Sequence, residues 1–249
     1  LEYNLEKNLM FFRIGSGLVP FASHEVCIFD WKKEFKKELQ EIGTFIKKNN
    51  FRISMHPDQF VLINAIDNKI VERSFFELKY HCAVLDLMGL DETAKIQIHV
   101  GGVYGEKEKA IKRFIENYKK LPEKVKKRLC IENEERLYCL KDCLEISKQV
   151  GIPIIFDFFH HALHNKGESI PESLSLVKKT WNKKDGIPMT DYSSQKEGER
   201  FGAHTESIDL KDFNKVLKEI KYSKVDIDIM LEIKDKENSA LRALDLLKK

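Results

Sequence analysis

The chain has 249 residues, of which 42% are hydrophobic and 33% charged, and its 43 basic and 40 acidic side chains leave a net charge of +3. A chain of this length can bury the core of one α/β domain or of two smaller ones. No apolar run approaches the roughly 18 residues that span a bilayer, and no secretion signal opens the sequence, so we expect neither membrane insertion nor secretion.

The charge and the cysteines indicate the type of surface and the compartment. Lysines gather in short clusters, which are more typical of solvated helix faces than of phosphate-binding patches. The five cysteines form an odd set without a Cys-x-x-Cys pair, which fits a reducing compartment. We therefore expect a cytoplasmic protein, and we expect it to be a monomer.

Short apolar, β-branched runs alternate along the chain with longer segments of helical period. Strands are expected at 10–14, 51–55, 95–100, 128–132, 153–158, 186–192 and 226–233. Helices are expected at 31–49, 69–88, 107–120, 137–149, 171–180, 210–220 and 237–248. Near-continuous apolar strands separated by helices predict a parallel sheet wrapped by helices.

The predicted fold is therefore α/β, and the strand count decides between its variants. A (β/α) barrel has eight strands, so seven strands predict a TIM-type barrel that lacks one β/α unit. A doubly wound open sheet is the alternative, although no Gly-x-Gly-x-x-Gly opens a helix. The sequence has no repeats and no obvious linker, so we expect one domain over 1–249.

Six consecutive predicted strands end on a carboxylate or an imidazole. These residues are His56, His99, Glu132, Asp157 followed by His160, Asp191 and Glu232. A single histidine at a strand end is more often an ordinary loop or core residue, but six coincidences favour a shared site. In a parallel barrel all of these strand ends lie on the face where active sites form.

Crowded carboxylates repel one another unless cations neutralise them. A mixture of imidazole and carboxylate suits Zn²⁺, Mn²⁺ or Fe²⁺ better than Ca²⁺ or Mg²⁺, and this number of ligands predicts two or three ions. Ions about 4 Å apart suit in-line displacement at phosphorus. Phosphodiester hydrolysis is therefore the favoured chemistry, and metal-dependent isomerisation or epimerisation of a sugar stays open as the alternative.

Several segments resemble the UV damage endonuclease family, whose members are TIM-barrel relatives of endonuclease IV. The segments are FFRIGSGLVPFASH (11–24), RISMHPDQF (52–60), IHVGGVYG (98–105), IENE (131–134), FDFFHH (156–161), YSSQ (192–195) and MLEIKDKE (230–237). The likeness runs in order and in spacing from about residue 9 to the end of the chain.

The resemblance implies a DNA repair nuclease that uses Mn²⁺ and nicks duplex DNA immediately 5′ of a UV photoproduct, leaving a 3′-hydroxyl and a 5′-phosphate. Abasic sites are further expected substrates. The metal ligands that the resemblance implies are His56, His99, Glu132, Asp157, His160, His204 and Glu232, to which the strand-end pattern adds Asp191.

The resemblance also assigns roles outside the ligand set. Glu132 matches the bridging carboxylate and His24 a functional histidine near the scissile bond. Gln59 and Phe60 match the pair that probes the damaged duplex. Without the resemblance, Gln59 and Phe60 would be interpreted as a surface loop with one anchoring aromatic. Candidate phosphate contacts are Lys196, Arg200, Lys234 and Lys236.

Three features depart from the family pattern. Members usually carry a histidine ligand at the position of Asp191 and a lysine at the position of Met189. The family's first strand and helix also precede the point where this sequence begins, which matches the count of seven strands. These departures leave a third hypothesis open, a damage-binding protein that does not cleave DNA.

Overall fold

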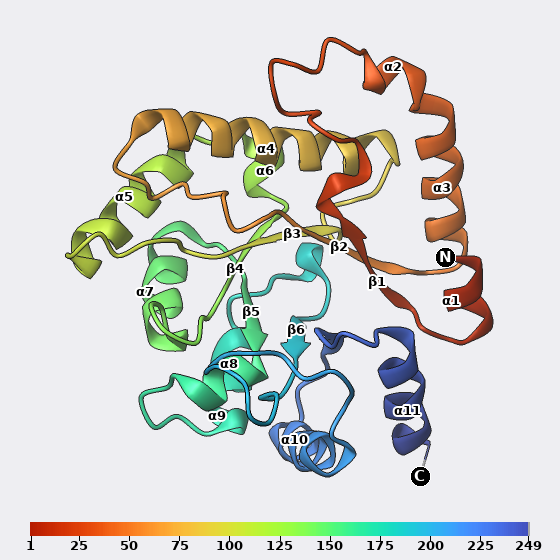
Figure 1. Ribbon diagram of the computed structural model, residues 1–249, viewed down its shortest axis with the longest axis vertical. Helices are drawn as coiled ribbons and strands as arrows, with labels where there is room; N and C mark the ends of the chain where they lie inside the picture. The colour runs from red at the N-terminus through yellow and green to blue at the C-terminus, as the bar shows by residue number, and fades with distance from the viewer. Residues whose placement is uncertain (249) are drawn as a thin grey trace.

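The structure is a computed structural model that describes residues 1–248, and its core is one sheet of seven parallel strands (Figure 1). The strands follow one another in the sheet in chain order. They are β1 (Phe11–Gly15), β2 (Arg52–His56), β3 (Lys95–Ile98), β4 (Leu129–Glu132), β5 (Ile154–Asp157), β6 (Met189–Tyr192) and β7 (Asp228–Leu231). All seven predicted strands are confirmed.

Helices surround this sheet and connect its strands. The longer ones are α3 (Lys36–Lys48), α4 (Asn68–Leu87), α5 (Lys107–Lys120), α7 (Leu140–Val150), α9 (Ile170–Lys178), α10 (Leu210–Ser223) and α11 (Glu237–Leu247). The short ones are α1 (Glu2–Glu6), α2 (Trp31–Glu34), α6 (Glu123–Lys126), α8 (Phe158–Leu163) and the 3-10 turns η1 (Ser16–Leu18) and η2 (Lys183–Asp185).

The predicted helices are confirmed with two differences. The expected helix over 31–49 is divided at Phe35 into α2 and α3, and the expected start at 137 moves to Leu140. The additional short elements α1, α6 and α8 span six residues or fewer. Such short pieces carry too little periodicity for a sequence pattern to reveal them.

The strands are rich in apolar residues because both of their faces are covered, and the polar exceptions Arg13, Lys95 and Gln97 pair with other polar groups inside the barrel. Every residue of β3, β4, β5 and β6 is buried, whereas β7 is half-buried throughout. The sheet curls into a nearly closed, TIM-like barrel. Strands β1 and β7 approach each other, but among the described residues no backbone ladder joins them.

The interior of the barrel is polar at the end where the strands begin. Alternate residues of a strand point to the same side, so Lys95, Gln97 and His99 rise through the barrel in successive layers. At the bottom, Lys95 Nζ lies 2.5 Å from Asp185 Oδ1, and both side chains are buried. This buried ion pair occupies the end of the barrel opposite the predicted site.

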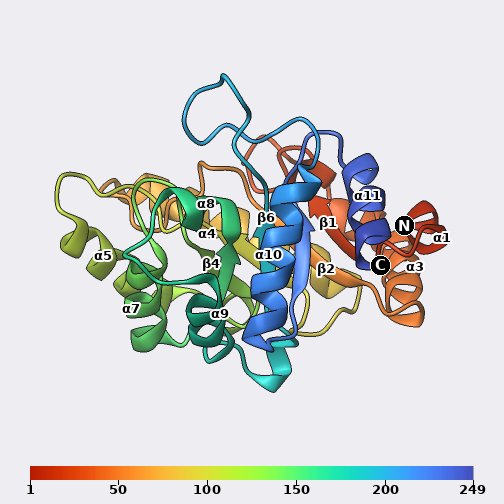
Figure 2. The same cartoon turned by 90° about the horizontal axis from the view of Figure 1, so that it is seen from below.

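The opposite end of the barrel, where the strands end, carries the loops that follow each strand. The loop between β6 and α10 projects beyond the strand ends (Figure 2). No helix within residues 1–248 combines the length and apolar character needed to cross a membrane.

Candidate metal centre

The residues predicted from the strand ends lie together at one end of the barrel. Three overlapping groups have ligand atoms within 4.8 Å of one another: His56 with His99 and Glu132, Glu132 with Asp157 and His160, and Asp157 with Asp191 and Glu232. Seven of the eight predicted ligands belong to these groups. The groups follow one another in the order of the strands, because strands that are consecutive in the chain also lie side by side in the sheet.

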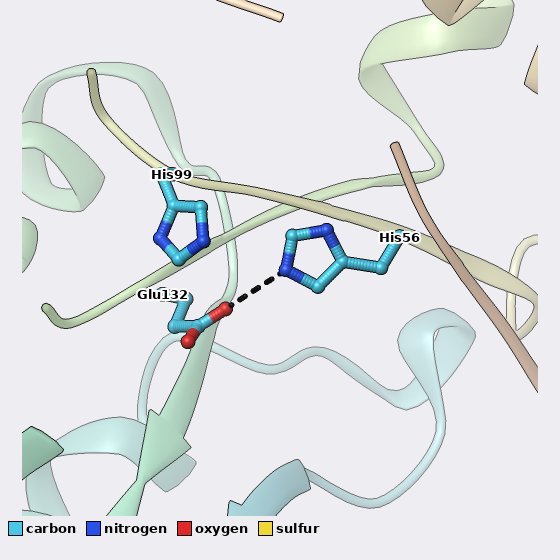
Figure 3. Close-up of side chains that lie close together, drawn as sticks. All are labelled: His56, His99 and Glu132. Atoms are coloured by element: carbon cyan, nitrogen blue, oxygen red, sulfur yellow. Dashed lines mark ion pairs between the residues drawn. The ribbon is translucent and has the colours of Figure 1, made fainter. Parts of the chain in front are cut away.

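The first group is formed by β2, β4 and the residue that follows β3. Figure 3 shows the His56 and His99 rings turned toward the Glu132 carboxylate. His56 Nε2 lies 3.4 Å from Glu132 Oε2, and the two ring centres are 5.1 Å apart. His56 Nδ1 donates to the Pro57 carbonyl oxygen at 2.8 Å. Because a carbonyl only accepts, the neutral ring keeps its Nε2 lone pair for a cation.

The second group is held by Asn133. The Asp157 N–H donates to Asn133 Oδ1 at 3.0 Å, and His160 Nδ1 donates to the Asn133 carbonyl oxygen at 2.9 Å. Asp157 caps α8 by accepting the His160 N–H on Oδ1 at 2.7 Å. Its other oxygen, Oδ2, is buried without a hydrogen-bond partner among residues 1–248. A buried carboxylate oxygen in this state is costly unless a cation satisfies it.

His204 lies beside the centre, outside the three groups. It is carried by the projecting loop after β6, where it forms a β-bridge with Gln195. Its Nδ1 donates to the Glu232 carbonyl oxygen at 2.8 Å, and its ring centre is 6.0 Å from that of His160. This orientation again leaves Nε2 free to accept a cation.

Arg13 is the site residue that sequence reasoning missed. Its guanidinium reaches from β1 to Asp191 Oδ1 at 2.7 Å and also forms an ion pair with Glu232. It donates to Gln97 Oε1 at 2.9 Å. Arg13 stands within the first segment that resembles the family, but nothing in the residue pattern marks an arginine in the middle of a strand as part of a metal site. Its role follows only from the approach of β1 to β6 and β7.

Burial and neighbouring charges shift the pKa values of the acids of this cluster in different directions. Burial acts to raise the pKa of Glu132, but His99, His160 and His56 outweigh that effect and hold it well below its usual range. Burial raises the pKa of Asp157 well above its usual range. His160 acts to lower this pKa, but the neighbouring carboxylates raise it further. Burial also raises the pKa of Glu134 to about 8. The donor set and the unpartnered Asp157 oxygen therefore fit divalent cations.

The remaining predicted residues lie on the loops around this centre. His24, Gln59 and Phe60 are exposed, and His24 and Phe60 line one cavity of about 670 Å³. Its wall includes Phe21 and Tyr80, so it is mostly apolar. His24 belongs to none of the three ligand groups.

The predicted phosphate contacts are partly engaged within the protein. Lys196 and Lys234 each place Nζ 2.8 Å from Glu206 Oε1, and these hydrogen bonds lower the pKa of Glu206 to about 2. Such exposed pairs exchange easily with other anions. Arg200 and Lys236 are exposed. Met189 is buried on β6, two residues before Asp191 and therefore on the same side of the strand.

A TIM-like barrel with clustered histidines and carboxylates at its strand ends defines a candidate metal-dependent barrel enzyme. The family model described as "UV-endonuclease UvdE" matches residues 1–249. The chain therefore belongs to the UV-endonuclease UvdE family.

Individual relatives agree with this assignment. The UV DNA damage endonuclease of Clostridium perfringens is 44% identical over 250 residues, which cover 100% of this chain and 60% of that protein. The crystal structure of SacUVDE superposes with a TM-score of 0.93 at 48% identity, covering 99% of this chain and 82% of that one. The chain thus spans about three fifths of the length of the Clostridium relative.

More distant structures share the fold alone. Endonuclease IV from Thermus thermophilus has a TM-score of 0.63 at 14% identity, covering 99% of this chain and 91% of that one. D-psicose 3-epimerase from Clostridium cellulolyticum has a TM-score of 0.62 at 13% identity, with 99% and 92% covered.

Proposed function

We propose that the chain is a DNA repair endonuclease that nicks duplex DNA immediately 5′ of a UV photoproduct, using Mn²⁺ or a similar transition ion. The observation that carries this proposal is the Glu132 carboxylate, which two groups of candidate ligands share. A carboxylate in this position can hold two cations close together, which is the arrangement that phosphodiester hydrolysis uses. The family supplies the expected substrate, and residues 1–249 would act as one domain.

The ligands fall into two sets in this proposal. His56, His99 and Glu132 would hold one ion, and Glu132, Asp157 and His160 would hold the second, with Glu232 and His204 at its side. When bound, such ions supply an activated water and a counter-charge for the leaving oxygen. The Pro57 carbonyl fixes the ring of His56 with Nε2 toward Glu132, so that this ligand is oriented before a cation arrives. The Asn133 carbonyl occupies Nδ1 of His160, which leaves Nε2 as the nitrogen that would accept a cation. His24, which lines the cavity that Phe60 also lines, would contact DNA near the scissile bond.

Lesion recognition would come from the loop that follows β2. Phe60 is 76% exposed, although an aromatic side chain normally gains from burial. An exposed ring can stack on bases or insert between them, and Gln59 can fill the gap beside a distorted pair. DNA that is already bent at a lesion costs less to deform further. This gives a physical reason for acceptance of abasic sites as well as photoproducts.

Backbone contacts and products complete the proposal. Lys196, Arg200, Lys234 and Lys236 would contact phosphates, and Glu206 would release Lys196 and Lys234 as DNA approaches. We propose a 3′-hydroxyl and a 5′-phosphate as the product ends, and a cytoplasmic monomer as the working state.

The test uses a labelled duplex with one pyrimidine dimer, incubated with the full chain and either Mn²⁺ or EDTA. The expected product is one Mn²⁺-dependent nick on the 5′ side of the dimer, which DNA ligase reseals because its ends are a 3′-hydroxyl and a 5′-phosphate. The same duplex without the dimer and the variant Glu132→Gln serve as controls. A metal-loaded, folded protein that leaves the dimer strand intact would contradict the proposal.

The second candidate is a damage-binding protein without cleavage, which Asp191 and Met189 favour because they replace a histidine and a lysine of the family pattern. It predicts selective binding of the dimer duplex without a nick, and recovery of cutting in the variant Met189→Lys with Asp191→His. Sugar epimerisation has only the shared fold in its favour. It predicts no salt-dependent affinity for DNA, whereas a nuclease loses affinity steeply as salt rises.

A further inference from the structure

We propose that Arg13 is a permanent cation that takes the place of a third metal ion, so that this chain holds two divalent ions and not three. The inference rests on the metal centre of the proposed function and concerns its third group, Asp157 with Asp191 and Glu232. It assigns Asp191 as the partner of Arg13 and removes it from the metal ligands predicted from the strand ends.

The position of Arg13 carries the first step. Its guanidinium lies between two acids that come from different strands, with Nη2 2.7 Å from Asp191 Oδ1 and Nη1 paired with Glu232. Nε lies 3.4 Å from Ser54 Oγ, and Nη2 also donates to Gln97 Oε1 at 2.9 Å. All three guanidinium nitrogens are thus engaged. A planar guanidinium held by this many partners fills the space between the two carboxylates.

The two oxygens of Asp191 carry the second step. Oδ1 accepts from Arg13, and Oδ2 accepts from the side-chain amide of Gln97, which also donates to Glu132. Asp191 is 0% exposed, so both of its oxygens are satisfied within the protein. Asp157 differs, because its Oδ2 has no hydrogen-bond partner in the part of the chain that the structure describes and lies 3.6 Å from His160 Nδ1, beyond hydrogen-bond distance. Asp157 therefore keeps one carboxylate oxygen for a cation, whereas both oxygens of Asp191 are already hydrogen-bonded.

Charge balance carries the third step. The three groups contain four carboxylates, from Glu132, Asp157, Asp191 and Glu232. Two divalent ions already balance four negative charges, and Arg13 adds a further positive charge. A third divalent ion would have to lie against the guanidinium in a poorly hydrated site, where like charges repel strongly. Arginine stays protonated at any working pH, so neither alkali nor a chelator removes this cation.

The experiment counts bound Mn²⁺ in purified, folded protein by elemental analysis after equilibrium dialysis, with no DNA present. The wild-type chain should saturate at two ions. The variant Asp191→Asn should still hold two, whereas Asp157→Asn should hold fewer. The variant Arg13→Met should gain a third ion, because Asp191 and Glu232 would then face each other without the guanidinium between them.

Each outcome decides the inference. Three ions in the wild-type protein, loss of an ion in Asp191→Asn, or two ions in a folded Arg13→Met protein would each overturn it. If Arg13→Met does not fold, the Asp191→Asn count decides. The matched control is Asp228→Asn, which breaks the pair of Asp228 with Arg52 Nε (3.3 Å) away from the predicted ligands and should keep two ions. Failure to nick DNA with two ions bound would reject the proposed function and leave this inference standing.

Discussion

His56 at the end of β2 and Glu132 at the end of β4 face each other across the end of β3, with Nε2 of the imidazole 3.4 Å from Oε2 of the carboxylate. The same carboxylate places Oε1 3.1 Å from Nδ1 of His160. Glu132 thus lies at the centre of the candidate ligands, between imidazoles that come from opposite sides. In the proposed site this central carboxylate would help to hold both cations.

The substitution Glu132→Gln should remove Mn²⁺ and nicking together. An amide keeps the shape of the side chain but loses the negative charge that would bridge two cations. We expect nicking of a dimer duplex to fall by more than about 100-fold, the upper range for loss of an outer-shell partner of a metal. Parallel measurement of bound Mn²⁺ and nicking rate checks this. Full metal content with lost activity would assign Glu132 a role other than metal binding.

Phe60→Leu should weaken discrimination between damaged and undamaged DNA and leave the fold intact. Phe60 is 76% exposed, so its replacement removes little packing. Base stacking on an aromatic ring contributes about 1–3 kcal/mol, and its loss should therefore lower affinity for a dimer duplex about 5-fold to 150-fold. Binding titrations on matched duplexes at one salt concentration measure the ratio. Tyr222→Leu, at a side chain 79% exposed on α10, is the control, and an equal loss on both duplexes would contradict the role of Phe60.

Gly43→Ala should destabilise the protein although alanine is the better helix former. Alanine normally gains about 0.5–1 kcal/mol over glycine inside a helix. At position 43 of α3, however, a Cβ atom would overlap the backbone carbonyl of Met88, which no side-chain movement can relieve. We expect a net loss of about 1–3 kcal/mol in unfolding free energy. Urea denaturation measures it, with the exposed neighbour Thr44→Ala as the control. A stabilised Gly43→Ala protein would show that α3 and Met88 do not pack as described.

His81 should make the protein less stable in mild acid. Burial lowers the pKa of this histidine below its usual 6.5, although the Glu77 carbonyl, 2.9 Å from Nδ1, opposes the shift. The unfolded chain then binds a proton more readily than the folded chain. The resulting stability is fully present above pH 6.5 and is lost as the pH falls below 6.5 toward the folded-state pKa.

The variant His81→Asn tests that pH dependence, because asparagine keeps a donor for the Glu77 carbonyl but does not titrate. The difference in unfolding free energy between pH 7 and pH 5 should be larger in the wild-type protein than in the variant. Equal differences in the two proteins would assign the acid sensitivity to other groups.

The barrel could be predicted because its strands are short, apolar and covered on both faces. Strand β4, for example, is buried at every position, and its residues Leu129, Cys130 and Ile131 form the apolar run before Glu132 that marks it in the sequence. Strand β7 is only half-buried, yet the β-branched Ile227, Ile229 and Ile233 in and beside it still indicated a strand. The division of α2 from α3 at Phe35 could not be predicted, because the apolar period continues across the break.

The candidate ligands could be predicted for a topological reason. Residues at the carboxyl ends of parallel strands meet at one rim, so position along the chain was enough to bring His56, Glu132 and Asp157 together. His204 follows no strand directly and came only from the family resemblance. Arg13 lies one layer lower in the interior of the barrel, where charge pairing depends on side-chain reach and not on a motif.

The gap between β1 and β7 has a mechanical consequence. No backbone ladder joins β1 and β7 among the described residues, and the ion pairs from Arg13 to Asp191 and Glu232 add a side-chain link between the first strand and the last two. The amide hydrogens of β1 and β7 should therefore exchange with solvent before those of β3 to β5. Mn²⁺ binding should slow that exchange, since Glu232 belongs both to this link and to the candidate metal centre.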